Sequence, residues 1–301
     1  MRKSVLTLAI ASAFAVPTLA TAQTAPAAAP ASPHTVTGNV SLVSDYRFRG
    51  ISQTFNLPAI QGGFDYAHSS GIYAGTWASN VYGGTNGSGL GVNYFNGGME
   101  WDFYGGYKFE AMKDITLDIG VLEYYYPGAK YGVPTKDKYN NTEVYIGAAW
   151  KWLTFKYSYS LTDYFGIKGN TVGTGAVPVT GACGIDGNGV PTTTCATSNA
   201  GSKGSQYFDL GATYELGSGF NLVGHIGRVK VKSYSLFNYT DYKLGVTKDW
   251  GGLTWGLAWI GTNAKKDVYR TAKMEGGLPP TSLSVKNTSS DTIVLSVAKT
   301  F

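Results

Sequence analysis

Charged residues, cysteines and long apolar runs are all scarce in this chain of 301 residues. Asp, Glu, Lys and Arg make up 14% of the sequence, whereas about a quarter is usual for a soluble domain. Beyond the N-terminus no run approaches the ~20 apolar residues of a transmembrane helix, which excludes a helical membrane protein. Two cysteines and three histidines form no cluster with metal-ligand spacing, so we expect no metal and no cofactor.

The N-terminus has the pattern of a secretory signal peptide. Arg2 and Lys3 give it a positive end, an apolar run follows, and an Ala-Thr-Ala cleavage site ends at position 22. The run is too short for a membrane span and no stop-transfer signal follows it. The predicted parts are a cleaved signal peptide at 1–22, an Ala/Pro-rich periplasmic linker at 23–34 and an outer-membrane β-barrel at 35–301.

Aromatic residues and glycine are abundant, and the aromatic residues alternate with polar ones. In the run M-E-W-D-F-Y-G-G-Y-K-F-E, Trp101 and Phe103 share one face while Glu100 and Asp102 share the other. This period of two is typical of a β-strand. Aromatic side chains on the apolar face are typical of membrane interfaces. The alternation therefore predicts strands with one face toward lipid and the other toward a lumen.

The same reading gives twelve strands in an antiparallel, up-and-down transmembrane barrel. They are Thr35–Arg49, Pro58–Ala67, Ile72–Asn80, Met99–Glu110, Ile115–Tyr126, Thr142–Lys151, Leu153–Asp163, Gln206–Leu216, Phe220–Lys232, Tyr239–Asp249, Leu253–Thr262 and Asp291–Phe301. Short and long connections alternate along the chain, as expected for short periplasmic turns and long extracellular loops. An even number of strands places both termini in the periplasm of a Gram-negative bacterium.

Charged and amide side chains on the inward faces are the candidate lumen-lining residues. They are Asp45, Arg47, Arg49, Gln61, Asp65, Glu100, Asp102, Lys108, Asp118, Glu143, Lys156, Asp209, Glu215, Asp241 and Lys243. In the first strand Arg47 and Arg49 would face the lumen near its outer mouth, with Tyr46 and Phe48 toward lipid. The arginines would either contact solutes through their donor forks or form salt bridges that stiffen the wall, and we favour the salt bridges.

Two groups of cations, one on a predicted strand and one in the outer loops, indicate what the outer surface could contact. Arg228, Lys230 and Lys232 continue the lipid-facing register of their strand. Either a bulge near a glycine flips that face, or these cations meet phosphates at the outer surface. The basic outer loops, with ten Lys or Arg against four Asp or Glu, also suit contact with outer-membrane lipids and lipopolysaccharide.

Cys183 and Cys195 both lie in the longest loop. Their even number and the oxidising compartment predict one disulfide between them.

The chain lacks the parts of an enzyme. His225 is the only histidine on a predicted strand, and no Ser-x-Gly context accompanies it, so we expect a wall histidine rather than a base. No motif indicates nucleic-acid binding. We expect a porin for passive diffusion of small hydrophilic solutes. The alternatives are a structural or adhesive barrel with a plugged lumen and, remotely, a barrel lipase.

Several runs resemble the TorF-type porin family of bacterial outer-membrane barrels, long catalogued as being of unknown function. They are G-N-V-S-L-V-S-D-Y-R-F-R-G-I-S-Q-T from Gly38, Y-Y-Y-P-G from Tyr124, K-Y-S-Y-S-L-T-D-Y-F-G from Lys156 and the final S-V-A-K-T-F. The resemblance implies passive transport but no binding residue. The last strand, ending in Phe301, also resembles the signal that the barrel assembly machinery reads.

Overall fold

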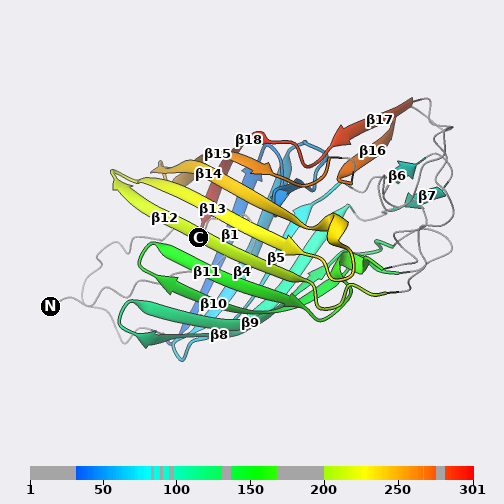
Figure 1. Cartoon of the computed structure of the whole chain (residues 1–301). Coiled ribbons are helices and arrows are strands. Elements are labelled where there is room, and N and C mark those ends of the chain that lie inside the picture. The colour runs from blue at the N-terminus through cyan, green and yellow to red at the C-terminus, as the bar shows by residue number, and fades with distance from the viewer. Residues whose placement is uncertain are drawn as a thin grey trace.

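A computed structural model of the chain describes residues 32–82, 85–88, 91–94, 98–130, 137–168, 200–266, 268–275 and 282–301. The chain forms a closed antiparallel β-barrel (Figure 1), which confirms the predicted fold class and all twelve strands. The strands are β1 (His34–Val43), β4 (Ala59–His68), β5 (Ile72–Asn80), β8 (Met99–Met112), β9 (Ile115–Tyr125), β10 (Asn141–Trp150), β11 (Leu153–Ser160), β12 (Gln206–Gly217), β13 (Phe220–Lys230), β14 (Tyr239–Trp250), β15 (Leu253–Thr262) and β18 (Thr292–Thr300).

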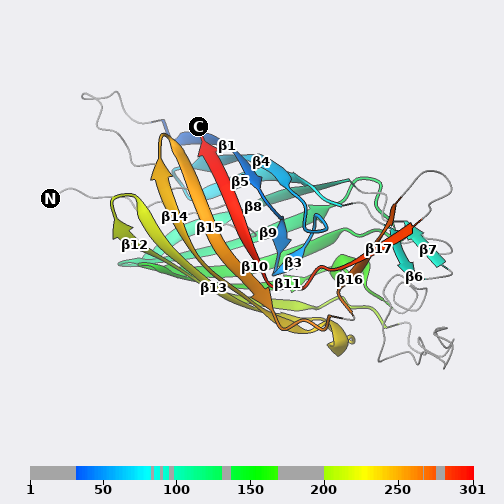
Figure 2. The same ribbon diagram turned by 90° about the horizontal axis from the view of Figure 1, so that it is seen from above.

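The first and last strands close the barrel. β1 pairs with β18 from Asn39 opposite Thr300 to Val43 opposite Ser296, and the two strands lie side by side in Figure 2. Closure leaves no unpaired strand edge, which a chain in lipid cannot tolerate. In the described part of the chain, no helix is long and apolar enough to cross a membrane.

The barrel wall is apolar outside and polar inside. On β8, Phe103 is 43% exposed, whereas Glu100, on the other face of the strand, is fully buried. The other strands repeat this arrangement, with exposed Phe155, Leu210 and Leu257 on their outer faces. An apolar surface of this extent is unstable in water, so the barrel requires a lipid environment.

The two ends of the barrel differ. We call one the turn end, because tight turns at 69–71, 113–114, 151–152, 218–219 and 251–252 lie there. Gly71, Asp114 and Lys151 adopt positive φ in these turns, at 99°, 64° and 54°. The first and last described strands also meet there, since the amide of Gly38 donates to the carbonyl of Phe301 at 2.7 Å.

The opposite, or loop, end carries the long connections (Figures 1 and 2). Its small elements are η1 (Tyr164–Gly166), η2 (Ser235–Phe237), β6 (Thr85–Ser88), β7 (Gly91–Tyr94), β16 (Arg270–Glu275) and β17 (Ser282–Asn287). The predicted Cys183–Cys195 bridge and the predicted signal peptide fall outside the described residues, so both stay predictions.

The prediction for the first strand is wrong at its C-terminal end. β1 stops at Val43 rather than Arg49, and the chain then turns into the lumen. Residues 44–58, which we call the lumen hairpin, contain β2 (Arg47–Phe48) and β3 (Ile51–Ser52). A turn at Arg49 and Gly50, with φ of 47° and 79°, joins the two short strands.

β13 contains no bulge within its pairing to β14. The register runs without a shift from Phe220 opposite Lys248 to Val229 opposite Tyr239. Arg228 and Lys230 therefore stay on the outer face near the loop end, where Arg228 donates to the Thr240 hydroxyl at 3.0 Å. Of the two alternatives raised by the sequence, the flipped face is excluded, and contact of these cations with phosphates stays a prediction.

Candidate functional site: the barrel interior

Aromatic packing holds the lumen hairpin against one side of the wall. The Tyr46 ring meets Trp77 of β5 edge-on at 5.5 Å, and the Phe48 ring meets Tyr124 of β9 at 5.3 Å. Phe165 of η1 packs on Phe48 at 5.5 Å from the loop end. All but Phe165 are buried, so the expected lipid contact of Tyr46 and Phe48 is wrong. These side chains instead form a core inside the barrel.

A buried ion pair fixes the tip of the hairpin to β10. Arg49 Nη2 donates to both Glu143 Oε1 and Oε2, at 3.0 and 2.8 Å, and the Arg49 and Glu143 side chains are 5% and 2% exposed. Arg49 also donates to the Tyr164 hydroxyl at 3.1 Å and lies 4.0 Å over the Tyr207 ring. Hydrogen bonds between a guanidinium and a carboxylate are charge-assisted, and these contacts offset the cost of burying both charges.

Arg47 and Asp45 hold the base of the hairpin. Arg47 Nε donates to Asp45 at 2.6 Å, and Nη1 donates to the carbonyls of Thr288 and Ser290 at 3.0 and 2.8 Å. The second Asp45 oxygen accepts from the Ser52 hydroxyl at 2.6 Å. Arg47 and Asp45 thus tie the hairpin to itself and to the connection that precedes β18.

Asp45, Arg47 and Arg49 therefore lie inside the barrel but on the hairpin, not on the wall of the first strand. Sequence reasoning put their charges in the lumen and offered a salt bridge as one of two readings. It missed the hairpin because alternation alone continues β1 through these positions. A signal was present in the sequence: Gly50 with Asn56-Leu57-Pro58 is the composition of turns.

The acids of β8 face the hairpin. Glu100 accepts hydrogen bonds from the hydroxyls of Tyr46 and Tyr126, each at 2.8 Å. Asp102 and Gln61 are buried beside this cluster, and Gln61 donates to the Ser79 hydroxyl at 3.2 Å. Tyrosine hydroxyls, rather than cations, are thus the partners of Glu100 among the described residues.

The half of the lumen nearer the turn end is lined by charges and tyrosines. The Asp118 carboxylate accepts from the Tyr73 hydroxyl at 2.7 Å and lies 3.9 Å from Lys108 Nζ. The Tyr104 hydroxyl donates to Asp65 at 2.5 Å, and Lys156 lies 4.2 Å over the Tyr145 ring. Their inward placement follows the alternation of each strand. Glu215 differs, because it is exposed at the turn end beside a register shift.

His225 is held between two carboxylates. Its Nδ1 lies 3.2 Å from Asp209 and its Nε2 lies 2.7 Å from Asp241. Asp241 also accepts from the Tyr207 hydroxyl at 3.1 Å. Because both ring nitrogens face carboxylates, neither is directed at a serine, as a hydrolase base would be.

Gly227 makes room for this cluster, since a Cβ at that position would overlap the Tyr207 hydroxyl and the Asp241 carboxylate. Among the described residues, no group of three His, Cys, Asp or Glu side chains is placed to bind a metal.

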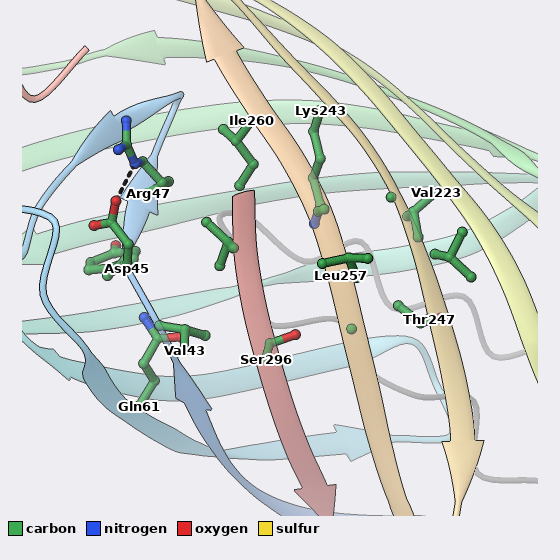
Figure 3. Close-up of a pocket in the computed structure, with 16 residues that line it drawn as sticks. Val43, Asp45, Arg47, Gln61, Val223, Lys243, Thr247, Leu257, Ile260 and Ser296 are labelled. Atoms are coloured by element: carbon green, nitrogen blue, oxygen red, sulfur yellow. Dashed lines mark hydrogen bonds and ion pairs between the residues drawn. The ribbon is translucent and has the colours of Figure 1, made fainter. Parts of the chain in front are cut away.

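A cavity lies between the base of the hairpin and the wall formed by β14, β15 and β18 (Figure 3). Together with the open solvent that it adjoins, its empty volume is ≈ 500 Å³. Asp45 and Arg47 line it from the hairpin, Lys243 from β14 and Ser296 from β18. Gln61 of β4 also lines the cavity, so Gln61 and Lys243 are the predicted lumen residues of the wall that border it.

The model of one protein family, Gcw_chp, matches residues 27–301. The chain belongs to this family. The family is described as a bacterial protein of unknown function. Membership therefore supports the resemblance to a bacterial family of unknown function, but it supports neither the TorF name nor a role in transport. No curated protein matches the chain.

Solved porin structures are among those that match the chain. The KdgM porin matches with a TM-score of 0.45 and 6% identity, over 89% of this chain and 99% of that one. The NanC porin matches with a TM-score of 0.44 and 10% identity, over 88% and 98%. OccK8 (OprE) of Pseudomonas aeruginosa matches with a TM-score of 0.37 and 14% identity, over 87% and 77%. These matches carry no residue role.

Proposed function

We propose that the protein is a narrow outer-membrane channel that passes small hydrophilic solutes passively, with the lumen hairpin as its constriction. The observation that carries this proposal is the cavity beside the hairpin, bordered by Asp45, Arg47, Lys243 and Ser296 inside a polar-lined barrel. A barrel of twelve strands is wider than the eight-strand size that side chains can fill. The hairpin occupies part of this extra width, and the cavity lies beside its base.

The proposed orientation places the turn end in the periplasm and the loop end outside. Short turns on the periplasmic side and long loops outside are usual in barrels of this class. Both termini would then be periplasmic, and Phe301, which is exposed at the turn end, would be accessible to the barrel assembly machinery. The cations Arg228, Lys230 and Lys232 would lie at the outer rim, at the level of lipopolysaccharide phosphates.

The second candidate is a structural or adhesive barrel with a sealed lumen. The buried aromatic contacts of Tyr46 and Phe48 favour it, since they close the side of the lumen next to β5 and β9. A sealed barrel and a narrow channel predict different behaviour in a lipid bilayer, even though their folds are identical.

The test is single-channel recording of the purified, folded protein in planar bilayers, with liposome swelling in sugars, organic acids and amine oxides of increasing size. We expect discrete conductance steps, and swelling that falls steeply as the solute grows. Folding is checked on the same sample by its heat-modifiable migration on a denaturing gel. Folded barrels that insert but show no conductance and no swelling would contradict the channel and support the sealed barrel.

A further inference from the structure

Three cations lie at the loop end of β13, on the outer face of the barrel. Arg228 and Lys230 follow the exposed Ile226 on this face, and Lys232 continues the alternation and is also exposed. We call Arg228, Lys230 and Lys232 the outer cation group. Alternate residues of a strand lie roughly 7 Å apart, so one phosphate placed between two neighbouring members can contact both.

The contacts of the outer cation group are with neutral side chains. Arg228 donates to the Thr240 hydroxyl at 3.0 Å, and Lys230 Nζ lies 5.4 Å from the centre of the Phe208 ring. Among the described residues, none of the three cations forms an ion pair with a carboxylate. Like charges held this close repel one another, so an anion bound between them would relieve the repulsion.

Aromatic side chains border the outer cation group on the neighbouring strands β11, β12 and β14 (Figure 1). Phe208 of β12 lies directly opposite Arg228 in the register, and its ring packs on Tyr157 of β11 at 5.0 Å. On the other side, Tyr242 of β14 lies opposite Ile226. Aromatic residues are enriched at the level of the membrane interface, so the cations lie where lipid headgroups are found.

Toward the turn end, the outer face of the same strands is apolar. Leu210 of β12, Leu222 and Ile226 of β13, and Leu244 of β14 are all exposed there. This face spans three adjacent strands, a width of roughly 10 Å, so it suits several parallel acyl chains rather than one. A group of cations above a broad apolar face therefore matches a phosphorylated lipid with many chains.

We propose that the outer cation group binds the phosphate groups of lipopolysaccharide, and that the acyl chains of the bound molecule lie on the apolar face of β12–β14. This inference goes beyond the proposed channel function and requires only the proposed orientation, with the loop end in the outer leaflet. Each phosphate accepts charge-assisted hydrogen bonds from neighbouring cations. The planar guanidinium of Arg228 suits two oxygens of one phosphate.

The first test compares lipids on the folded wild type and needs no substitution. Native mass spectrometry in detergent measures the binding of bisphosphorylated lipid A, dephosphorylated lipid A and phosphatidylglycerol, with inorganic phosphate as a competitor. We expect bisphosphorylated lipid A to bind at least about tenfold more tightly than either other lipid, because only it offers two phosphates to the cations.

Three results of this comparison would contradict the proposal. Equal binding of dephosphorylated lipid A would show that the phosphates are not recognised. Equal binding of phosphatidylglycerol would assign the site to phospholipids in general. Displacement of lipid A by an equimolar amount of inorganic phosphate would assign it to a free anion.

The second test removes the charges, in the variant Arg228→Gln/Lys230→Gln/Lys232→Gln. The matched control removes three cations from the turn end, in the variant Lys151→Gln/Lys248→Gln/Lys299→Gln. Each cation at an anionic lipid surface contributes roughly fivefold to binding, so the first variant should bind bisphosphorylated lipid A about a hundredfold more weakly than the wild type. The control should bind it like the wild type.

Both variants are first checked for folding by heat-modifiable migration. Wild-type affinity in the folded Arg228→Gln/Lys230→Gln/Lys232→Gln variant would overturn the site, as would an equal loss of affinity in the control. The measurement involves no current, so a barrel that binds lipid A without conducting would contradict the channel alone.

Discussion

Removing Arg49 tests whether the lumen hairpin is held by a specific buried contact. In the Arg49→Met variant, the Asn141 amide, which donates to Oε1 at 3.0 Å, would be the one hydrogen-bond donor left to the Glu143 carboxylate among the described residues. Deleting one partner of a buried ion pair costs about 3–5 kcal/mol, because the other charge stays buried without compensation. The loss falls on the docked state of the hairpin, since β10 itself keeps its pairing with β9 and β11.

A change of this size alters the ratio of undocked to docked hairpin by about a hundredfold or more, at ~1.4 kcal/mol per factor of ten. We therefore expect Arg49→Met to show a larger mean conductance, with frequent transitions to a wider state. The barrel should still migrate as a folded, heat-modifiable protein. Single-channel recording in planar bilayers, at equal protein load and voltage, is the measurement.

The matched control is the double variant Arg49→Met/Glu143→Gln, which removes both charges. If burial of an unpaired carboxylate causes the undocking, the double variant should open less often than Arg49→Met alone. With the single variant Glu143→Gln, the set completes the cycle that measures the coupling of the pair. The reasoning is refuted if folded Arg49→Met channels show the conductance and the transition frequency of the wild type.

Three further outcomes follow from the sequence and the structure. Unboiled protein should migrate faster than boiled protein in a denaturing gel, because a closed barrel resists opening. In cell fractionation the protein should be found with the outer membrane, and its recovery as a soluble periplasmic monomer would contradict the barrel. The Cys183→Ser/Cys195→Ser variant should lose a disulfide that is worth ~3 kcal/mol in the chain-entropy model. Because this disulfide would constrain only its loop, the heat-modifiable migration of the variant should match that of the wild type. Free thiols that react before reduction would argue against the bridge. Gly227→Val should lower the thermal midpoint of the folded barrel, because overpacking costs about 1–3 kcal/mol where the new side chain meets Tyr207 and Asp241. Gly224→Val, where a Cβ would meet nothing within 4 Å, is its control, and equal midpoints would contradict the crowding.

The barrel could be predicted from the sequence because its signal is repeated twelve times. Every wall strand alternates, as Trp101 and Phe103 do with Glu100 and Asp102, and a slip of one residue would expose the whole inner face to lipid. The alternation of short and long connections then assigns each connection to one end of the barrel. Pairing needed no further information, because consecutive strands of an up-and-down barrel are neighbours.

The lumen hairpin could not be predicted by the same reasoning. Tyr46, Phe48 and Leu42 share one parity, so alternation assigns all three to lipid, yet only Leu42 is exposed. What ends β1 is tertiary: the inward turn is stabilised by Glu143 and by the carbonyls of Thr288 and Ser290. These partners lie 94, 241 and 243 positions away along the chain. A local sequence pattern does not indicate contacts between residues so far apart along the chain.

The cavity could not be predicted from a local sequence pattern either. Gly245, Gly256 and Ser296 come from three strands, and none of them stands out in a chain with 41 glycines. Whether these small residues border a cavity depends on where the hairpin lies, since they would line a wide pore in its absence. Lys243 was identified as inward-facing, but its position on the cavity required the fold.

Deleting the lumen hairpin tests the central claim most directly. Val43 and Ala59 are cross-strand partners in the β1–β4 register, so residues 44–58 can be replaced by Asn-Gly, which favours a tight two-residue turn. The wild type and the deletion variant are compared by single-channel recording, after both have passed the heat-modifiability check. We predict small conductance steps for the wild type and much larger ones for the deletion variant. Equal conductance in the two folded proteins would show that the hairpin does not constrict the channel, and would contradict the account.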